Sequence, residues 1–329
     1  MPRPPALVAA LALLGGLVAA VLGLLTFGAQ ASSAPEALPL AVTGAGAERV
    51  AGHGPVDWRV VAPEQARRLL LDKEVYGVLE LGRPATVVVS GAVNPAGTQA
   101  AQQVLSGAAQ AAGVPFTVET LHPASTAGRT APLAASALLW IGGLVAAAAL
   151  GALTLRRRIA PTTASRYGLV AGVGLAATGA VAGLLALWDS SLPLTADVLG
   201  YLLLTAVAFA SVQGALVKFL GIRALAVLGP LYLIAPSVAG TVPELLDPVY
   251  RALLWSWTPF RFSAEGLRSL LQGTPDAPDV LTGVVVLGGL AVLGLAALAL
   301  PSARQEAQPD RPHGVVDVGV HQADRLPSA

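Results

Sequence analysis

Long apolar stretches that are almost free of charge interrupt this chain of 329 residues. They cover residues 6–27, 133–155, 167–187, 195–217, 224–240 and 280–300. A helix of about 20 apolar residues crosses the hydrocarbon core of a bilayer, whereas a water-soluble fold of this size has no interior for so many such segments. The sequence therefore predicts an α-helical polytopic membrane protein with six transmembrane helices.

Composition agrees with this class and excludes several others. Hydrophobic residues make up 54% of the chain and charged residues 12%, where a soluble domain carries about 25% charge. A net charge of +1 without a dense Lys/Arg stripe lacks the electrostatic signature of nucleic-acid binding. The chain has no cysteine, which excludes disulfides and Cys-ligated metals. We expect no nucleic-acid partner, no metal and no cofactor.

The first apolar stretch has two interpretations. Residues 29–31 read A-Q-A, which has the form of a signal-peptidase site, and a cleaved signal peptide is one possibility. The apolar stretch is, however, longer than the roughly 7 to 15 residues of a signal-peptide core. We favour an uncleaved transmembrane helix within residues 1–28.

The short loops predict the orientation of the helices. The loop after the second apolar stretch contains four cations and no acid, namely Arg156, Arg157, Arg158 and Arg166. Cytoplasmic loops of membrane proteins are enriched in Lys and Arg, so this loop is expected inside the cell. The next loop carries Asp189 and the following one Lys218 and Arg223, which continues the alternation. A multi-pass protein of the cell membrane with both termini in the cytoplasm is predicted.

Residues 29–132 differ from the rest, because here charged residues and short periodic segments return. Strand-like runs cover residues 38–42, 57–61, 75–81, 86–93 and 116–121, and helical runs cover 63–71 and 97–112. These alternating segments predict a small α/β domain, inserted outside the cytoplasm between the first and second transmembrane helices. His53 and His122 are isolated there, so neither indicates a metal site.

Two of the predicted helices in the region 133–300 have unusual compositions. Pro230 and Pro236 interrupt the fifth apolar stretch, which predicts either a kinked but ordinary helix or a broken helix beside a translocation path. In the third stretch a stripe of small residues indicates close helix packing, unless it only reflects the abundance of Ala and Gly. The stripe consists of Gly168, Gly172, Ala176, Gly179 and Gly183.

The predicted external loop 241–279 is too long and too apolar for a simple connection. Its spacing predicts two short amphipathic helices in the outer membrane interface, with their charges directed to water or to each other. Glu265 stands at helical spacing from Arg261 and Arg268. The alternative is a cover over the lipid surface without a further role.

Within this loop two motifs carry a family resemblance. Residues 240–248 read G-T-V-P-E-L-L-D-P, and residues 259–268 read P-F-R-F-S-A-E-G-L-R. Together with the order of one span, an external domain and five spans, they resemble permeases of the second ATP-binding-cassette exporter class, in the branch that includes the bacterial phage infection protein. The motif positions are Gly240, Pro243, Pro259, Glu265, Gly266 and Arg268. The sequence departs from the family pattern at Ala239, where a glycine is expected, and in its short segment before the first span.

The resemblance implies half of an exporter. Two permease chains, identical or paralogous, would form the membrane unit, and each would contact a separate cytoplasmic ATPase through the loop at residues 156–166. The positive-inside rule alone also explains the arginines of this loop. The chain contains no G-x-x-x-x-G-K-[ST] motif, so we expect a transport subunit whose ATP hydrolysis resides in a partner chain rather than an enzyme.

A second hypothesis is a non-transporting membrane protein whose external domain binds a ligand, a cell-wall component or a phage. The predicted spans have no acid in their interior, since Asp197 lies at the very start of the fourth, which disfavours proton-coupled transport. No paired catalytic residues there indicate an intramembrane enzyme. Residues 301–329 are polar and rich in Pro, Asp and Gln, which predicts a disordered cytoplasmic tail.

Overall fold

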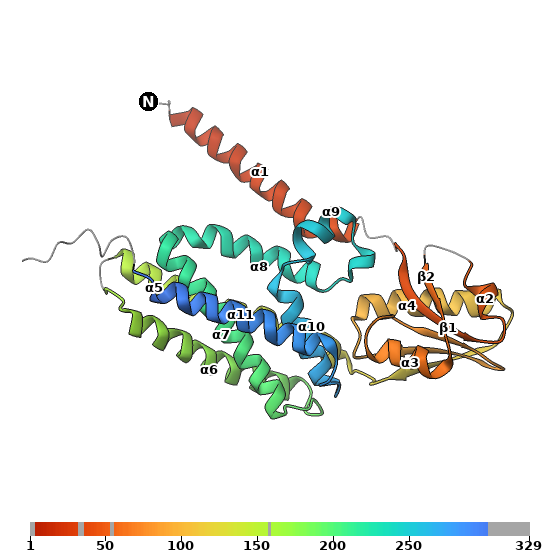
Figure 1. Ribbon diagram of the computed structural model, residues 1–329. Helices are drawn as coiled ribbons and strands as arrows, with labels where there is room; N and C mark the ends of the chain where they lie inside the picture. Colours follow the sequence, from red (N-terminus) through yellow and green to blue (C-terminus); the bar gives the residue numbers. More distant parts are fainter. Residues whose placement is uncertain (1–3, 32–35, 53–55, 157–158, 302–329) are drawn as a thin grey trace, which may run out of the picture. The chain divides into compact units, whose positions relative to one another are not determined.

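The computed structural model describes residues 4–31, 36–52, 56–156 and 159–301 (Figure 1). Most of these residues are helical, and one five-stranded sheet is present. Four helical stretches are long and apolar enough to cross a membrane: Thr126–Leu155, Thr163–Trp188, Ala196–Ala239 and Pro278–Ala299. The predicted tail lies outside the described residues, apart from Pro301.

Two of the six predicted spans are not among these four stretches as separate helices. Helix α1 (Pro4–Ala31) contains a shorter apolar run, Ala12–Gly28. Helix α8 (Leu225–Ala239) follows α7 (Ala196–Leu220) through the short 3₁₀ turn η1 (Gly221–Ala224), so that together they form one stretch of 44 residues. Within the part of the chain that the structure describes, four helical stretches are thus long and apolar enough to cross a membrane, where the sequence predicts six.

Helix α8 contains both prolines that interrupt the fifth apolar stretch. The helix runs through Pro230 and Pro236 without ending at either. Each proline removes one backbone N–H and bends rather than terminates a helix whose neighbours hold it in place. The structure therefore has a continuous helix from Leu225 to Ala239 through both prolines.

The long helices pack around α7. It contacts α5 (Thr126–Leu155), α6 (Thr163–Trp188) and α11 (Pro278–Ala299), which lie side by side in Figure 1. Their shared core contains three buried aromatic rings, Trp140, Phe209 and Phe260, whose centroids lie 5.0 to 5.4 Å apart. The small-residue stripe of α6 is exposed within the described chain and contacts no other helix there.

Between α1 and α5 the chain forms a mixed sheet, as the strand-like runs predict. Its strands are β1 (Leu38–Gly44), β2 (Val56–Val60), β3 (Val78–Leu81), β4 (Ala85–Ser90) and β5 (Phe116–Leu121). Their order is β2-β1-β3-β4-β5, and only the β3–β4 pair is antiparallel. We call the described residues from 36 to 125 the sheet part.

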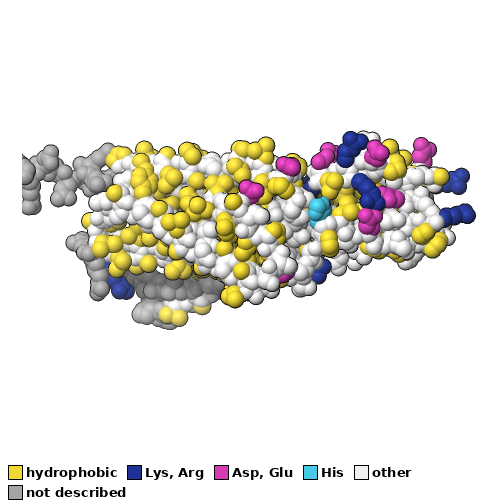
Figure 2. Space-filling model, turned by 90° about the horizontal axis from the view of Figure 1, so that it is seen from below, with side chains coloured by type: hydrophobic (Ala, Val, Ile, Leu, Met, Phe, Trp, Pro, Cys, Tyr) yellow, Lys and Arg dark blue, Asp and Glu magenta, His cyan; other side chains and the backbone are white. Residues whose placement is uncertain are grey.

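Helices cover both faces of this sheet because its apolar residues alternate along the strands. Leu40, Leu79 and Val87 face α4 (Pro95–Ala111), and Ala41, Val78 and Val88 face α3 (Pro63–Leu71). The four-residue helix α2 (Ala47–Val50) lies beside β1. Figure 2 shows most of the visible charged side chains over the sheet part, whereas the visible face of the long helices is mainly apolar.

Candidate functional site

The segment between α8 and α11 packs into the protein. It contains the 3₁₀ turn η2 (Pro243–Leu245), α9 (Pro248–Tyr250), the π-helical turn η3 (Arg251–Trp255) and α10 (Pro259–Leu271). Helix α10 contacts α5, α7, α8 and α11. Pro259 begins it, where a missing N–H costs nothing, and Phe260, Ala264 and Leu267 are buried on its apolar face.

The second predicted helix is present as α10, but its charged side chains Arg261, Glu265 and Arg268 line a cavity and form no ion pair with each other among the described residues. Of its charged side chains, Arg268 is only 3% exposed. The first predicted helix is present as a short helical segment, in which α9 continues directly into η3, and η2 precedes it. Their apolar residues pack partly on α1 and α8, while Val249, Leu253 and Trp257 remain exposed. The physical reason is that the apolar face of α10 packs on neighbouring helices, which also buries Arg268 at its edge.

A cavity of about 380 Å³ lies where α10 meets the sheet part. Its charged and polar lining comes from α10, α11, η2 and the sheet part: Asp72, Lys73, Tyr76, Asn94, Glu244, Arg261, Glu265, Arg268, Asp279 and Thr282. Residues far apart in the sequence therefore meet at one place, and the predicted motif positions Pro243, Glu265 and Arg268 are among its lining residues.

A buried ion pair closes one side of the cavity. Lys73 Nζ lies 2.5 Å from Asp279 Oδ2, at the N-terminal turn of α11, and it also donates to Ser269 Oγ. The Ser269 hydroxyl lies 2.9 Å from both Asp279 oxygens. Burial lowers the pKa of Lys73, and the carboxylate of Asp279 opposes that shift. This cluster connects the sheet part to α10 and α11.

A second link joins the sheet part to η2. The Tyr76 hydroxyl donates to Glu244 Oε2 at 2.7 Å, and the Glu36 amide donates to the Glu244 carbonyl at 2.8 Å. Burial raises the pKa of Tyr76, and the Glu244 carboxylate raises it further. Tyr76 therefore stays a hydrogen-bond donor at neutral pH, and the acid of η2 is held by the sheet part.

Three donors beside the cavity have no acceptor among the described residues. They are Asn94 Nδ2, Arg261 Nε and Arg268 Nε. Burial lowers the pKa of Arg261 and of Arg268 from the ordinary arginine value. A buried donor without an acceptor costs free energy. These three atoms are among seven buried side-chain polar atoms that have no partner among the described residues.

Glu265 does not form the predicted ion pairs. It lies on α10 between Arg261 and Arg268, but no ion pair within 4.0 Å joins it to either residue among those the structure describes. Burial raises the pKa of Glu265, and the two guanidiniums oppose this rise. The helical spacing of Arg261, Glu265 and Arg268 is present in α10, and all three side chains line the cavity.

The remaining motif residues act through packing. A Cβ at Gly266 would collide with the Tyr201 ring and hydroxyl, so glycine allows α10 to approach α7. There the Tyr201 hydroxyl donates to the Phe262 carbonyl at 2.7 Å. Gly240 ends α8 with a helical φ of −76° and lies against Leu133.

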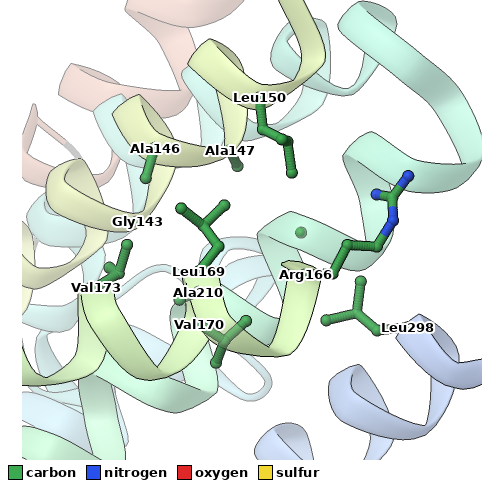
Figure 3. A pocket seen from close by; sticks show the side chains of 11 residues that line it. Gly143, Ala146, Ala147, Leu150, Arg166, Leu169, Val170, Val173, Ala210 and Leu298 are labelled. Carbon is green, nitrogen blue, oxygen red and sulfur yellow. The ribbon is translucent and has the colours of Figure 1, made fainter. Parts of the chain in front are cut away.

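The predicted coupling loop lies at the other end of the long helices. Arg156 follows α5 and is exposed, and Arg166 lies in the second turn of α6. Arg157 and Arg158 lie outside the described residues. Figure 3 shows Arg166 at the edge of an apolar crevice of about 10 Å³, with its guanidinium directed away from the apolar side chains. The crevice has room for about one water molecule.

Sequence reasoning missed Lys73, Asn94 and Asp279 as site residues. Lys73 follows α3 with a φ of 60°, and Lys is rare in this chain. Asp279 lies in the first turn of α11, where acids are common, so its position in the sequence does not indicate the ion pair with Lys73. Neither residue carries a local signal of its partner, because Lys73 and Asp279 are 206 positions apart.

Replacing Glu265 with Gln is expected to stabilise the protein at neutral pH, because Gln has nearly the same shape without the charge whose burial raises the pKa of Glu265. A carboxyl whose folded pKa is raised above its ordinary 4.5 contributes stability below that value and loses it as pH rises through the folded pKa. The charged and titratable groups around it are Arg261, Arg268, Asp279 and Lys73.

The measurement is thermal unfolding in mild detergent from pH 4 to 8. The variant and the natural protein are expected to coincide near pH 4 and to diverge as pH rises. Glu64→Gln, at an exposed position on α3, serves as the control and should give no such divergence. A Glu265→Gln profile parallel to that of the natural protein would contradict the raised pKa.

Comparison with known proteins identifies no relative. No protein-family model, no curated protein and no solved structure matches this chain.

Proposed function

We propose that this chain is the membrane-spanning permease subunit of an ATP-driven exporter and works with a separate cytoplasmic ATPase. In this proposal α1 and α8 complete six membrane crossings in the cell membrane, both termini are cytoplasmic, and the sheet part lies outside. The resemblance of the loop motifs to exporter permeases supports the proposal, and so does the apolar character of the long helices.

The observation that carries the proposal is the position of α10. It packs on α5, α7 and α11, and its residues also meet the sheet part at the charged cavity. A permease driven from the cytoplasm has to pass a change in helix packing to its external part. An element that contacts both suits that task, and α10 is joined to the sheet part by the hydrogen bond from Lys73 to Ser269.

The partner contacts follow from two exposed features. The connection between α5 and α6 offers Arg156 and Arg166 to a cytoplasmic protein. The exposed small-residue face of α6 is a surface on which helix backbones can approach closely. In this proposal a second permease chain, identical or paralogous, packs there. Both contacts are part of the proposal.

Purification in gentle detergent tests the ATPase partnership. The natural protein is expected to co-purify with an ATP-hydrolysing protein. Replacing Arg156, Arg157, Arg158 and Arg166 together with Lys keeps the charge that orients the helices but removes the bidentate guanidiniums. We expect at least about tenfold less ATPase to co-purify with this variant than with the natural protein.

The matched control is Arg223→Lys, in the other loop expected inside the cell, which should retain the ATPase. A reporter fused to the C-terminus verifies that the orientation is unchanged in every variant. The proposal fails if the natural protein repeatedly yields no ATPase, or if Lys and Ala variants of the four arginines leave both the ATPase and export intact.

One observation favours the second hypothesis, a ligand-binding membrane protein. A groove of about 950 Å³ lies on the α4 side of the sheet part, where α2 is too short to cover the strands beside α4. Trp58, Leu81 and Val104 line it together with Arg49 and Arg83. The two hypotheses differ in the purification experiment, because only the exporter requires an ATPase.

A further inference from the structure

The cavity beside α10 presents hydrogen-bond donors that lack acceptors. Asn94 is 6% exposed and Arg268 is 3% exposed, and Asn94 Nδ2, Arg261 Nε and Arg268 Nε have no partner among the described residues. All three groups can only donate. A ligand that satisfies them has to bring several acceptor oxygens.

Contacts with neighbouring residues hold two of these donors, Asn94 and Arg261, in place. Asn94 Oδ1 accepts from the Ala96 amide at 3.0 Å and caps α4, so its Nδ2 group is the end left over. The Arg261 guanidinium stacks on two aromatic rings, with Cζ 3.7 Å from the Trp255 centroid and 4.2 Å from that of Phe262. These donors are therefore positioned before any ligand arrives.

The acids of the cavity are largely committed elsewhere. Asp279 is paired with Lys73, Glu244 accepts from the Tyr76 hydroxyl, and Asp72 is exposed to solvent at the rim. Glu265 is left to face two guanidiniums. The lining holds three cations and four acids, so it is the unpaired donors, rather than a net positive charge, that favour an oxyanion. Helix α4 begins beside the cavity with the positive end of its helix dipole.

We propose that this cavity binds the phosphate group of an anionic ligand, with Arg261, Arg268 and Asn94 as its ligating residues. Guanidiniums form two parallel hydrogen bonds to such oxyanions, and three separate donors match the several oxygens of a phosphate better than the two of a carboxylate. The proposal does not depend on the exporter function, because it concerns the cavity of the isolated chain.

Two sources of phosphate are distinguished by the choice of probe. The full-length protein in a maltoside detergent, which contains no phosphate, is titrated with inorganic phosphate in one arm. The other arm uses dioctanoyl phosphatidic acid, with the uncharged dioctanoylglycerol as its matched control. Binding is measured as the shift in the melting temperature and by calorimetry.

Asn94→Asp and Arg268→Gln are the informative variants. Asn94→Asp keeps the oxygen that caps α4 but replaces the Nδ2 donor with an acceptor, and Arg268→Gln removes a buried charge without an ion pair. Each is expected to weaken phosphate binding about tenfold or more, the usual effect of a lost charge-assisted hydrogen bond. Arg251→Gln, an exposed arginine outside the cavity, should bind as the natural protein does.

Stability without ligand separates binding from a structural role. Removing an unpaired buried charge does not destabilise a protein as breaking an ion pair does, so unliganded Arg268→Gln is expected to melt no lower than the natural protein. If Arg268→Gln does not fold, the phosphate affinity of Asn94→Asp still tests whether the cavity binds phosphate.

The outcomes are distinct. Binding of inorganic phosphate that depends on Asn94 and Arg268 identifies a free phosphate or phosphate ester as the ligand. Binding of phosphatidic acid alone, with the same dependence, identifies a lipid headgroup. The proposal is overturned if neither probe binds, or if both variants bind as tightly as Arg251→Gln. Absence of an ATPase partner would leave these results unchanged.

Discussion

Replacing Asp279 with Asn is expected to lower the free energy of unfolding by about 3–5 kcal/mol, because it leaves a buried ammonium without its counter-ion. Lys73 Nζ lies 2.5 Å from the Asp279 carboxylate, and the two side chains are 17% and 16% exposed. Ser269 cannot replace the lost charge, since its hydroxyl is neutral. Denaturant unfolding of the purified protein in mild detergent measures the loss.

A surface pair in the same protein provides the control. Arg59 and Glu74 lie 2.6 Å apart but are 36% and 54% exposed, so Glu74→Gln should cost less than about 1 kcal/mol. Replacing Lys73 with Met and Asp279 with Leu together removes both charges and should recover most of the stability. Equal effects of Asp279→Asn and Glu74→Gln would contradict the structure at this junction.

Replacing Phe260 with Ala is expected to destabilise the protein by about 3 kcal/mol, at the lower end for a buried phenylalanine. Phe260 is fully buried between Trp140 and Phe209, at centroid distances of 5.1 and 5.4 Å. In a membrane protein the loss is mainly one of packing, because lipid tails are as apolar as the core. The cavity left behind removes contacts from both remaining rings.

Thermal unfolding measures this effect, with Phe260→Leu expected to lie between the natural protein and Phe260→Ala. Phe219, which is 51% exposed at the end of α7, is the matched control, and Phe219→Ala should cost less than about 0.5 kcal/mol. If Phe219→Ala destabilises as much as Phe260→Ala, the aromatic cluster does not hold α10 on the long helices.

Local patterns predicted the elements of the sheet part closely. Residues 63–71 were expected as a helix and form α3 with the same bounds, because proline at the first position and apolar spacing act within one turn. The run 116–121 is likewise β5. The long helices were predicted for a similar reason, since a window of apolar residues is read without knowing its neighbours.

The candidate site was predicted only in part. The family motif includes Glu265, Gly266 and Arg268, but the sequence predicts that the charges of this segment face water or each other. Lys73 and Asn94, which complete the cavity, belong to the sheet part and have no local pattern that points to α10. A contact between residues nearly two hundred positions apart depends on how whole elements pack, which periodicity does not report.

By itself the sequence determined which segments are helix or strand and that long helices must avoid water, because hydropathy and periodicity act over one or two turns. Only the tertiary structure decided that α8 stays helical through Pro230 and Pro236, that Phe260 enters an aromatic core, and that Lys73 meets Asp279. These outcomes depend on which surfaces meet, and the free energy of burial and pairing belongs to both partners of a contact rather than to either segment alone.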